Sequence, residues 1–555
     1  MGRFEQAVLV VLLAVTALKV LQITSNARVE RALLPDEARP PPAAPLLQPP
    51  PVVLEPPAAA CHGDSASPAN VAASPPPAPR SAFCDANTLS LFSRRVVTSA
   101  GTFSAVVHVV NGVVSSVEPA SSPPPGSLDF SPFVLSPGLI DVHAHMDEPG
   151  RTHWEGFRTG TASAAAGCLT TLIEQPLNSV PATTTASALA EKLAAAGSGE
   201  DNQLSVDVAF WGGLVPSNAR DPAALTALLS AGVVGLKAFM SPSGVDEFDH
   251  ASVDDLRSAM PALAAAHKPL MVHAELPSPL DDHTAALIAV GDATHHSTWA
   301  LSRPIEWEAA ALDALLSIAH PAVRIHVAHV SAASTAATIR GAVSRGLNVS
   351  GETCAHYLTW TTEDVPRGET RLKCAPPLRA GEANREGLWS ELKYSAEAPE
   401  SGGMRLMGSD HSPSPPDMKL VDASTGLGDF VAAWGGVASL QLSLPAFWEG
   451  ARNRGFTPSH LAQLWSAQPA DLVGLGGTKG RVAPGGDADF CIWDPDAEVA
   501  PGGEGHTLYH RHAGTPYDGR VLHGRVVATF LRGAKVFDVR GGVASATCGR
   551  PILVR

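Results

Sequence analysis

The chain has 555 residues, a formal net charge of -15 at pH 7, 45% hydrophobic residues and 17% charged residues. This length suffices for one large α/β domain with a smaller partner, and the composition is typical of a protein that buries a core. The acidic balance argues against a general nucleic-acid partner, because phosphate binding needs a surplus of Lys and Arg on one face. A small uncharged substrate fits this charge better.

The beginning of the chain has the layout of a signal peptide. An apolar run covers Ala7 to Leu18, and small residues follow at Ser25 to Ala27. The run is shorter than the roughly 20 residues that span a bilayer. We therefore expect residues 1–27 to direct the chain into the secretory pathway, with the endoplasmic reticulum as its destination. An uncleaved membrane anchor is the alternative, because Val20, Leu21 and Ile23 extend the apolar character.

Residues 28–88 are expected to form a disordered linker. Pro and Ala dominate this segment, as in PPPAAPLLQPPP and SPPPAP. Proline favours extended chain and removes backbone hydrogen-bond donors, so a packed core is not expected here.

Two β-rich flanks enclose the middle of the chain. Short β-type runs at Arg95 to Val97 and Ser104 to Val110 are followed by Asn111-Gly112, a hairpin signal. A similar texture returns near the C-terminus, at Asp487 to Trp493 and Val526 to Leu531. We expect residues 89–137 and 480–545 to build one small β-sandwich from both chain ends.

Residues 138–479 alternate between strand and helix patterns eight times. The expected strands end at His143, Gln175, Gly213, Phe239, His273, His329, Glu352 and Ser409. Expected helices between them include Ala186 to Ala196, Val253 to Ala266, Glu306 to Ala319 and Ser334 to Arg345. Eight alternations predict an α/β fold with a (β/α)8 TIM-type barrel. An open doubly wound sheet is the alternative, but no glycine-rich phosphate loop follows the first strand.

Seven cysteines are too few for a disulfide scaffold in a chain of this length, and the odd number leaves at least one thiol unpaired. Three of them lie inside expected barrel segments and are expected to be buried free thiols: Cys168, Cys354 and Cys374. Three others are peripheral and could pair: Cys61, Cys84 and Cys548.

The first barrel strand ends in a motif typical of a metal site. Gly138 to His145 reads GLIDVHAH, and alternate residues of a strand share a face, so His143 and His145 are expected to point into the barrel mouth. Imidazole is a favoured zinc ligand. A chance His-x-His is plausible in a chain with 21 histidines, so this motif alone is moderate evidence.

Other strand ends supply matching groups. Lys237, His273 and His329 each end an apolar run, and Asp410 follows the last expected strand. Lys237 could be a surface lysine, but an unpaired ammonium at a buried strand end would be costly. His326 has the opposite parity from His329, so only His329 is assigned to the mouth. Together with the histidine pair, these side chains make six groups suited to two divalent ions.

With these residues in place, the sequence resembles the amidohydrolase superfamily and, within it, the allantoinase family. The resemblance covers about residues 90 to 545 and is carried by PGLIDVHAHMDEPGR, TTLIEQPLNS, GLKAFMS, MVHAE, SRPIEWEAAAL, HVAHVS, ETCAHYL, KCAPPLR and GSDHSP. It implies six metal ligands: His143, His145, Lys237, His273, His329 and Asp410. Lys237 would be an N6-carboxylysine, formed from carbon dioxide, that bridges both ions. Zinc is the expected metal, with Mn, Co and Fe as alternatives.

The resemblance also implies an activity, metal-dependent hydrolysis of the cyclic amide of allantoin to allantoate in purine catabolism. Two ions would activate a water molecule and polarise the amide carbonyl, and Asp410 would act as general base and then general acid. Asn178 and the backbone at Ala375 and Gly436 are expected substrate contacts. A homotetramer is the implied assembly.

Three alternative functions within the superfamily differ in the residues that they require or in the substrates that they take. Dihydroorotase would have Arg two residues after the His-x-His, where this chain has Asp147, and an acid there would repel the anionic substrate. A hydantoinase or dihydropyrimidinase acts on neutral rings and is harder to separate. A non-catalytic structural relative would lack ligands, whereas all six are present here.

Overall fold

The computed structural model describes residues 83–84, 88–280, 282–503, 506–512 and 514–555. The expected signal segment, most of the expected linker and Cys61 lie outside the described residues, so those expectations stay predictions. Among the described helices, none combines the length and the apolar character needed to cross a bilayer.

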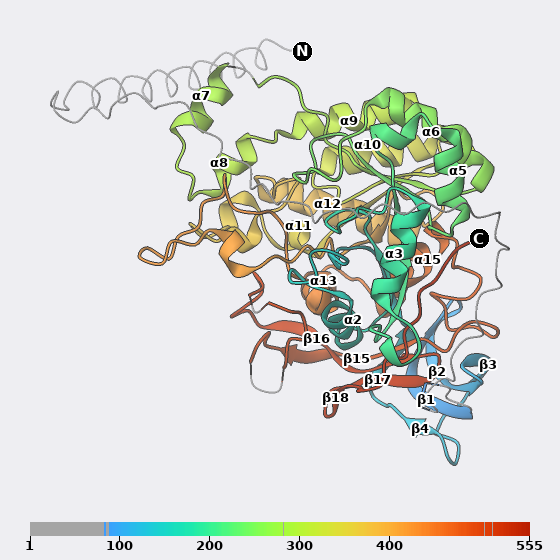
Figure 1. Cartoon of the computed structure of the whole chain (residues 1–555). Helices are drawn as coiled ribbons and strands as arrows, with labels where there is room; N and C mark the ends of the chain where they lie inside the picture. The colour runs from blue at the N-terminus through green and yellow to red at the C-terminus, as the bar shows by residue number, and fades with distance from the viewer. Residues whose placement is uncertain (1–82, 85–87, 281, 504–505, 513) are drawn as a thin grey trace, which may run out of the picture. The chain divides into compact units, whose positions relative to one another are not determined.

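Eight parallel strand positions form the barrel in the described part of the chain. Figure 1 shows the ribbon of the whole chain. The strands are β6 (Leu139–Ala144), β7 (Leu169–Glu174), β8 (Asp207–Phe210) with β9 (Gly212–Gly213), β10 (Leu236–Phe239), β11 (Leu270–His273), β12 (Ile325–Val327), β13 (Val349–Thr353) and β14 (Met404–Met407). The ladders run as β6-β7-β8 and as β9 to β14, because Trp211 interrupts the third position. Between β14 and β6, the His145 N–H donates to the His411 carbonyl at 2.8 Å.

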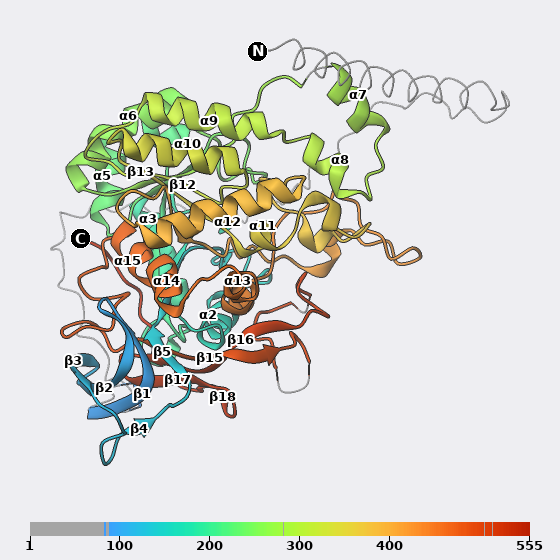
Figure 2. The ribbon, with the colours of Figure 1, turned by 180° about the vertical axis from the view of Figure 1, so that it is seen from behind.

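The helices follow the strands as the alternating pattern predicted. They are α2 (Phe157–Ala166), α3 (Ala186–Ala196), α4 (Pro216–Ala219), α5 (Pro222–Ser230), α6 (Val253–Ala266), α7 (Asp282–Val290), α8 (His296–Leu301), α9 (Ile305–Ser317), α10 (Ala333–Ser344), α11 (Ala355–Thr359), α12 (Glu382–Glu397), α13 (Ser443–Arg452), α14 (Pro458–Ala462) and α15 (Gln468–Leu472). Figure 2 shows α9, α10 and α12 side by side on one flank of the barrel. The fold class expected from the sequence is confirmed.

Both β-rich flanks join in one hydrogen-bonded sheet of nine strands. Its strands are β1 (Thr88–Thr98), β2 (Gly101–Val110), β3 (Val113–Pro119), β4 (Leu128–Asp129), β5 (Val134–Pro137), β15 (Phe490–Val499), β16 (Leu522–Leu531), β17 (Ala534–Asp538) and β18 (Gly542–Val543). The two chain ends meet where β5 pairs antiparallel with β15, with Leu135 opposite Ile492. Asn111 and Gly112 have φ of 53° and 76° and form the turn between β2 and β3. The helices α2 and α13 pack beside β16 (Figures 1 and 2).

Two disulfides tie this sheet and the C-terminal segment to the rest of the chain. Cys84 pairs with Cys548, as their peripheral positions allowed, and Cys168 pairs with Cys491. The expectation of a free thiol at Cys168 is therefore wrong. Cys168 directly precedes β7 and Cys491 lies in β15, so their Cα atoms, 5.1 Å apart, are brought together by barrel-to-sheet packing rather than by sequence proximity. The expected free thiols are confirmed at the other two barrel positions, Cys354 and Cys374.

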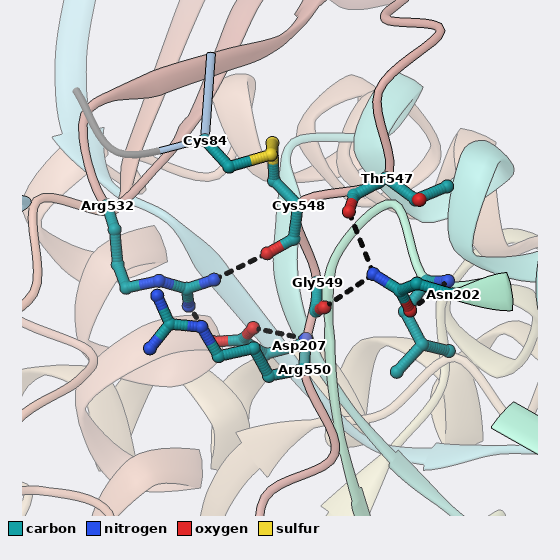
Figure 3. Close-up of a disulfide and its surroundings, with 9 residues drawn as sticks. Cys84, Asn202, Asp207, Arg532, Thr547, Cys548, Gly549 and Arg550 are labelled. Carbon is teal, nitrogen blue, oxygen red and sulfur yellow. Dashed lines mark hydrogen bonds and ion pairs between the residues drawn. A yellow bond between two sulfur atoms is a disulfide. The ribbon is translucent and has the colours of Figure 1, made fainter. Parts of the chain in front are cut away.

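The C-terminal segment lies along the start of β8. The Val208 N–H donates to the Arg550 carbonyl at 3.0 Å, and the Ile552 N–H donates to the Val208 carbonyl at 2.8 Å. Figure 3 shows the Cys84–Cys548 disulfide beside Arg532, whose guanidinium donates to the Cys548 carbonyl at 2.6 Å. The segment is thus fixed by both backbone pairing and a covalent link.

A cluster of aspartates joins barrel and sheet. The Lys479 ammonium lies 2.8 Å from Asp207, 2.8 Å from Asp487 and 2.7 Å from Asp489, and Arg532 also pairs with Asp207. Because each of these carboxylates already pairs with a side-chain cation, the cluster is an ion-pair network rather than a metal site.

Candidate metal centre

A bulge in β6 brings two histidines to the barrel mouth. Ile140 and Val142 pack in the barrel interior. Between the pairs Asp141–Leu172 and Ala144–Glu174, β6 contains one more residue than β7. A bulge of this kind re-aims the side chains that follow it. His143 and His145 are therefore both presented at the mouth, with 1% and 5% of their surface exposed.

The expected ligands form two neighbouring groups. His143 Nε2 and His145 Nε2 lie 3.2 and 3.6 Å from Asp410 Oδ1. His273 Nδ1 lies 2.9 Å from His329 Nε2. The rings of His143 and His329 connect the groups, with centroids 5.2 Å apart. The first group offers two imidazole nitrogens and a carboxylate oxygen, and the second offers two imidazole nitrogens. In each group these atoms lie close enough together to bind one ion.

Lys237 lies between these groups and the barrel interior. Its Nζ is 3.4 Å from His143 Nε2 and 5.2 Å from the centroid of the Phe239 ring. No carboxylate within the described residues forms an ion pair with it at 4.0 Å or less. Burial lowers the pKa of Lys237 to about 8, although Glu352 and Asp410 oppose the change. An amine with this pKa is partly uncharged at neutral pH, as carbamate formation requires.

His326 and His329 occupy different levels of the barrel. The His326 ring bonds to Ser350 Oγ at 2.9 Å and to Glu352 Oε2 at 3.2 Å, below the site. His329 follows the end of β12 with a φ of 37°, and this left-handed turn carries its ring to His273. The assignment of His329 to the mouth agrees with the structure, but the turn rather than strand parity separates the two histidines.

The donor set has the chemistry of a metal centre. Burial lowers the pKa of His145 to about 4 and that of His329 well below its usual value, so both imidazoles are neutral at pH 7. Burial alone would raise the pKa of Asp410, but the charge of His143 and a hydrogen bond from His145 hold it well below the usual range. Neutral imidazoles and an ionised carboxylate are the forms that bind divalent ions.

A cavity of about 340 Å³ opens over this centre. Five of the six expected ligands line it, and Lys237 lies beneath it. The three expected substrate contacts also line the cavity: Asn178, Ala375 and Gly436. The ligand and substrate roles of these residues stay predictions. Trp299, Arg303, Lys373 and Trp434 form other parts of the wall.

Asp147 does not face the cavity. It is fully buried, outside the cavity lining, and has a φ of 60°. Burial raises the pKa of Asp147 well above its usual value, and the neighbouring Glu174 and Glu155 raise it further. The expected repulsion of an anionic substrate by this side chain is therefore wrong, because the bend of the chain after the His-x-His turns it away.

Two buried glutamates that sequence reasoning missed support the histidines. Glu352 Oε1 lies 2.5 Å from His143 Nδ1, and Glu275 Oε2 lies 2.7 Å from His273 Nε2. Carboxylates commonly orient metal-binding imidazoles in this way. A signal existed for Glu275, because it lies two residues after His273. Nothing in the local sequence links Glu352 to His143, which is 209 residues away.

The sequence and the fold of this chain are similar to those of known enzymes. The family model "Amidohydrolase family" matches residues 134–536. A probable allantoinase of Oryza sativa subsp. japonica is 41% identical over 83% of this chain and 90% of its own length. The allantoinase of Arabidopsis thaliana is 40% identical over 82% and 89%. The solved structure of L-hydantoinase (dihydropyrimidinase) from Arthrobacter aurescens has a TM-score of 0.75 and 29% identity, covering 83% of this chain and 99% of that one.

Proposed function

Because this chain belongs to the amidohydrolase family, we propose that it hydrolyses the cyclic amide of allantoin to allantoate, a step of purine catabolism. The observation that carries the proposal is the convergence of four imidazoles and Asp410 on one cavity, with Lys237 in contact with His143. This donor set suits hydrolysis of a carbon–nitrogen bond by an activated water molecule.

The centre is proposed to hold two divalent ions, with zinc as the first choice and Mn, Co or Fe as alternatives. His143, His145 and Asp410 would hold one ion, and His273 and His329 the other. Lys237, as N6-carboxylysine, would supply an oxygen to each. When bound, such ions lower the pKa of a water molecule and polarise an amide carbonyl.

Asp410 is the proposed proton carrier. It is ionised at neutral pH and reaches the cavity, so it can accept a proton from the attacking water. The same carboxyl group then donates this proton to the departing ring nitrogen, which would otherwise leave as a poor anionic group. Trp299 and Trp434 form apolar parts of the wall beside this carboxyl group.

A hydantoinase or dihydropyrimidinase activity is the second candidate, because solved structures of such enzymes share the fold. Identity favours the first candidate: the curated allantoinases match at 36% to 41%, and the hydantoinase structures at 29% or less. A structural role without catalysis does not fit a complete donor set.

A substrate panel tests the proposal. Purified protein loaded with Zn²⁺ is assayed with allantoin, hydantoin, dihydrouracil and dihydroorotate. We expect the highest kcat/KM for allantoin and a far lower value for dihydroorotate. A higher kcat/KM for hydantoin or dihydrouracil than for allantoin would favour the second candidate, and no turnover of any ring by metal-loaded protein would remove the proposal.

We further propose entry into the secretory pathway, with the endoplasmic reticulum as the site of action. The two disulfides are consistent with an oxidising compartment. A fluorescent reporter fused to residues 1–40 should be exported from the cytosol, and cytosolic fluorescence would contradict this. Assembly as a homotetramer completes the proposal, and light scattering of the purified protein measures it.

A further inference from the structure

Arg303 connects the wall of the cavity to one histidine of the metal centre. It lies in the connection between α8 and α9, lines the cavity, and keeps 15% of its side chain exposed. Its Nε donates to both carboxylate oxygens of Glu275, at 3.1 and 3.0 Å, and its Nη2 pairs with the same group. The Glu275 side chain is fully buried.

Glu275 in turn holds His273. Its Oε2 lies 2.7 Å from His273 Nε2, and the Phe239 ring stacks on the imidazole at 4.6 Å. A carboxylate on Nε2 selects the tautomer with the proton on that nitrogen. The lone pair of His273 is then on Nδ1, the atom that faces His329 Nε2.

This arrangement depends on the cation. A buried carboxylate without a partner is costly and would become protonated or draw in water. The planar guanidinium of Arg303 meets Glu275 through more than one N–H, which fixes the orientation of the carboxylate as well as its charge. The second cation of the wall, Lys373, donates instead to the carbonyls of Val431 and Ala433.

We propose that Arg303 is a positioning residue of the metal centre: by pairing with Glu275, it orients His273 so that Nδ1 is presented to the ion. This rests on the proposed two-metal function. It predicts that Arg303 controls metal affinity even when no substrate is present, although its side chain lines the substrate cavity.

The test measures Zn²⁺ affinity of metal-free protein by competition with a chelator, for the wild type and for Arg303→Gln, Glu275→Gln and the double variant. Substitutions of groups that support metal-binding histidines typically cost 10–100-fold in affinity. We expect a loss of roughly this size for one of the two ions in each single variant. Because Arg303 acts through Glu275, the double variant should lose little more than Glu275→Gln alone.

Arg340→Gln is the matched control. Arg340 makes a comparable two-point pair with Glu391, at 2.8 and 3.0 Å, between α10 and α12. The Arg340→Gln variant should bind Zn²⁺ with the affinity of the wild type. If circular dichroism shows that metal-free Arg303→Gln is unfolded, Arg303→Lys takes its place in the comparison of single and double variants. Lysine keeps the charge but not the planar fork of the guanidinium.

Two results would overturn the inference. One is unchanged affinity for both ions in the Arg303 variant, in which case any loss of turnover comes from substrate contact. The other is a double variant whose loss is the sum of the single losses. Failure of the proposed two-metal centre looks different, because wild-type protein would then bind no Zn²⁺, whereas failure of the proposed activity would leave Zn²⁺ binding in place and abolish turnover of every ring in the substrate panel.

Discussion

Lys237 differs from the other buried lysines of the described chain in its surroundings. Lys192 pairs with Glu174, Lys479 pairs with three aspartates, and Lys268 donates to three carbonyl oxygens at 2.7 to 2.8 Å. Lys237 is as deeply buried, but its Nζ contacts an imidazole nitrogen and an aromatic ring and forms no ion pair at 4.0 Å or less with the described residues. Carboxylation would remove the unpaired charge and supply two oxygens to the adjacent donors.

Substitution of Lys237 by alanine tests this chemistry. We expect Lys237→Ala to bind fewer than two ions per chain and to lose nearly all activity, while the barrel still folds. Acetate or propionate can occupy the vacated space, so either should restore part of the rate. Metal stoichiometry and turnover are measured together. A variant that keeps two ions and full activity would falsify the carbamate bridge.

Lys268→Met is the control for the loss of a buried lysine. It leaves three carbonyls without their donor, so the free energy of unfolding should fall by about 1–3 kcal/mol. Because Lys268 lies at the opposite end of its barrel segment, where it donates to the Val554 carbonyl of the C-terminal segment, metal content should stay at the wild-type value.

For single residues, the sequence allowed the expected ligands to be chosen because each stands within or just after an apolar strand. Predictions were wrong or missing where the position of a side chain depends on bends of the backbone or on partners distant in sequence. Asp147 was expected in the cavity, but the chain turns at positive φ there. Glu352 was missed because its contact with His143 joins β13 and β6, which are not paired strands, across 209 residues of sequence.

Among the connecting segments, the loop after β14 determines how Asp410 is held. Asp410 has a φ of 46°, and the Ser412 N–H donates to the Val437 carbonyl at 3.1 Å. The loop is fixed further where the Gly436 N–H donates to the Lys373 carbonyl at 2.7 Å. Gly436 has a φ of 133°, and a Cβ there would lie 2.1 Å from the Ser412 carbonyl oxygen. No side chain fits without moving Ser412, two residues from Asp410.

Gly436→Ala is therefore expected to displace Asp410 and to lower kcat on the order of 10²-fold, as small misplacements of catalytic groups do. Gly435→Ala is the matched control, since its added Cβ would meet no atom closer than 3.8 Å. Steady-state kinetics and thermal unfolding of both variants separate catalysis from stability. Equal kcat for the two variants would show that this turn does not position Asp410.

Helices were predicted more closely than strands. The helix expected from Val253 to Ala266 has those bounds in α6, because the Ser252 side chain caps its first turn and accepts from the Asp255 N–H. The bulge in β6 and the break at Trp211 have no such signal. Both depend on how neighbouring strands pair, which residue patterns within one strand do not record.

Over the whole molecule, disulfides join segments far apart in sequence. Cys84–Cys548 and Cys168–Cys491 close loops of 464 and 323 residues. Cross-links over long loops restrict the unfolded chain most, and removing a native disulfide typically costs about 2–4 kcal/mol. Their position in the chain suggested pairing for the peripheral cysteines, but it could not identify Cys491 as the partner of a barrel cysteine.

Disulfides form and persist in oxidising compartments, so these two cross-links test the proposed localisation. Replacing Cys168 and Cys491 together by alanine should lower the free energy of unfolding by about 2–4 kcal/mol, and a reductant should do the same to the wild type while affecting the variant less. Cys354→Ala, which removes a buried free thiol, should respond to the reductant as the wild type does. Protein taken from its own cells and denatured without reduction should show at most three free thiols of seven. Seven reactive thiols would mean that the chain resides in a reducing compartment, and the proposed secretory localisation would then be wrong.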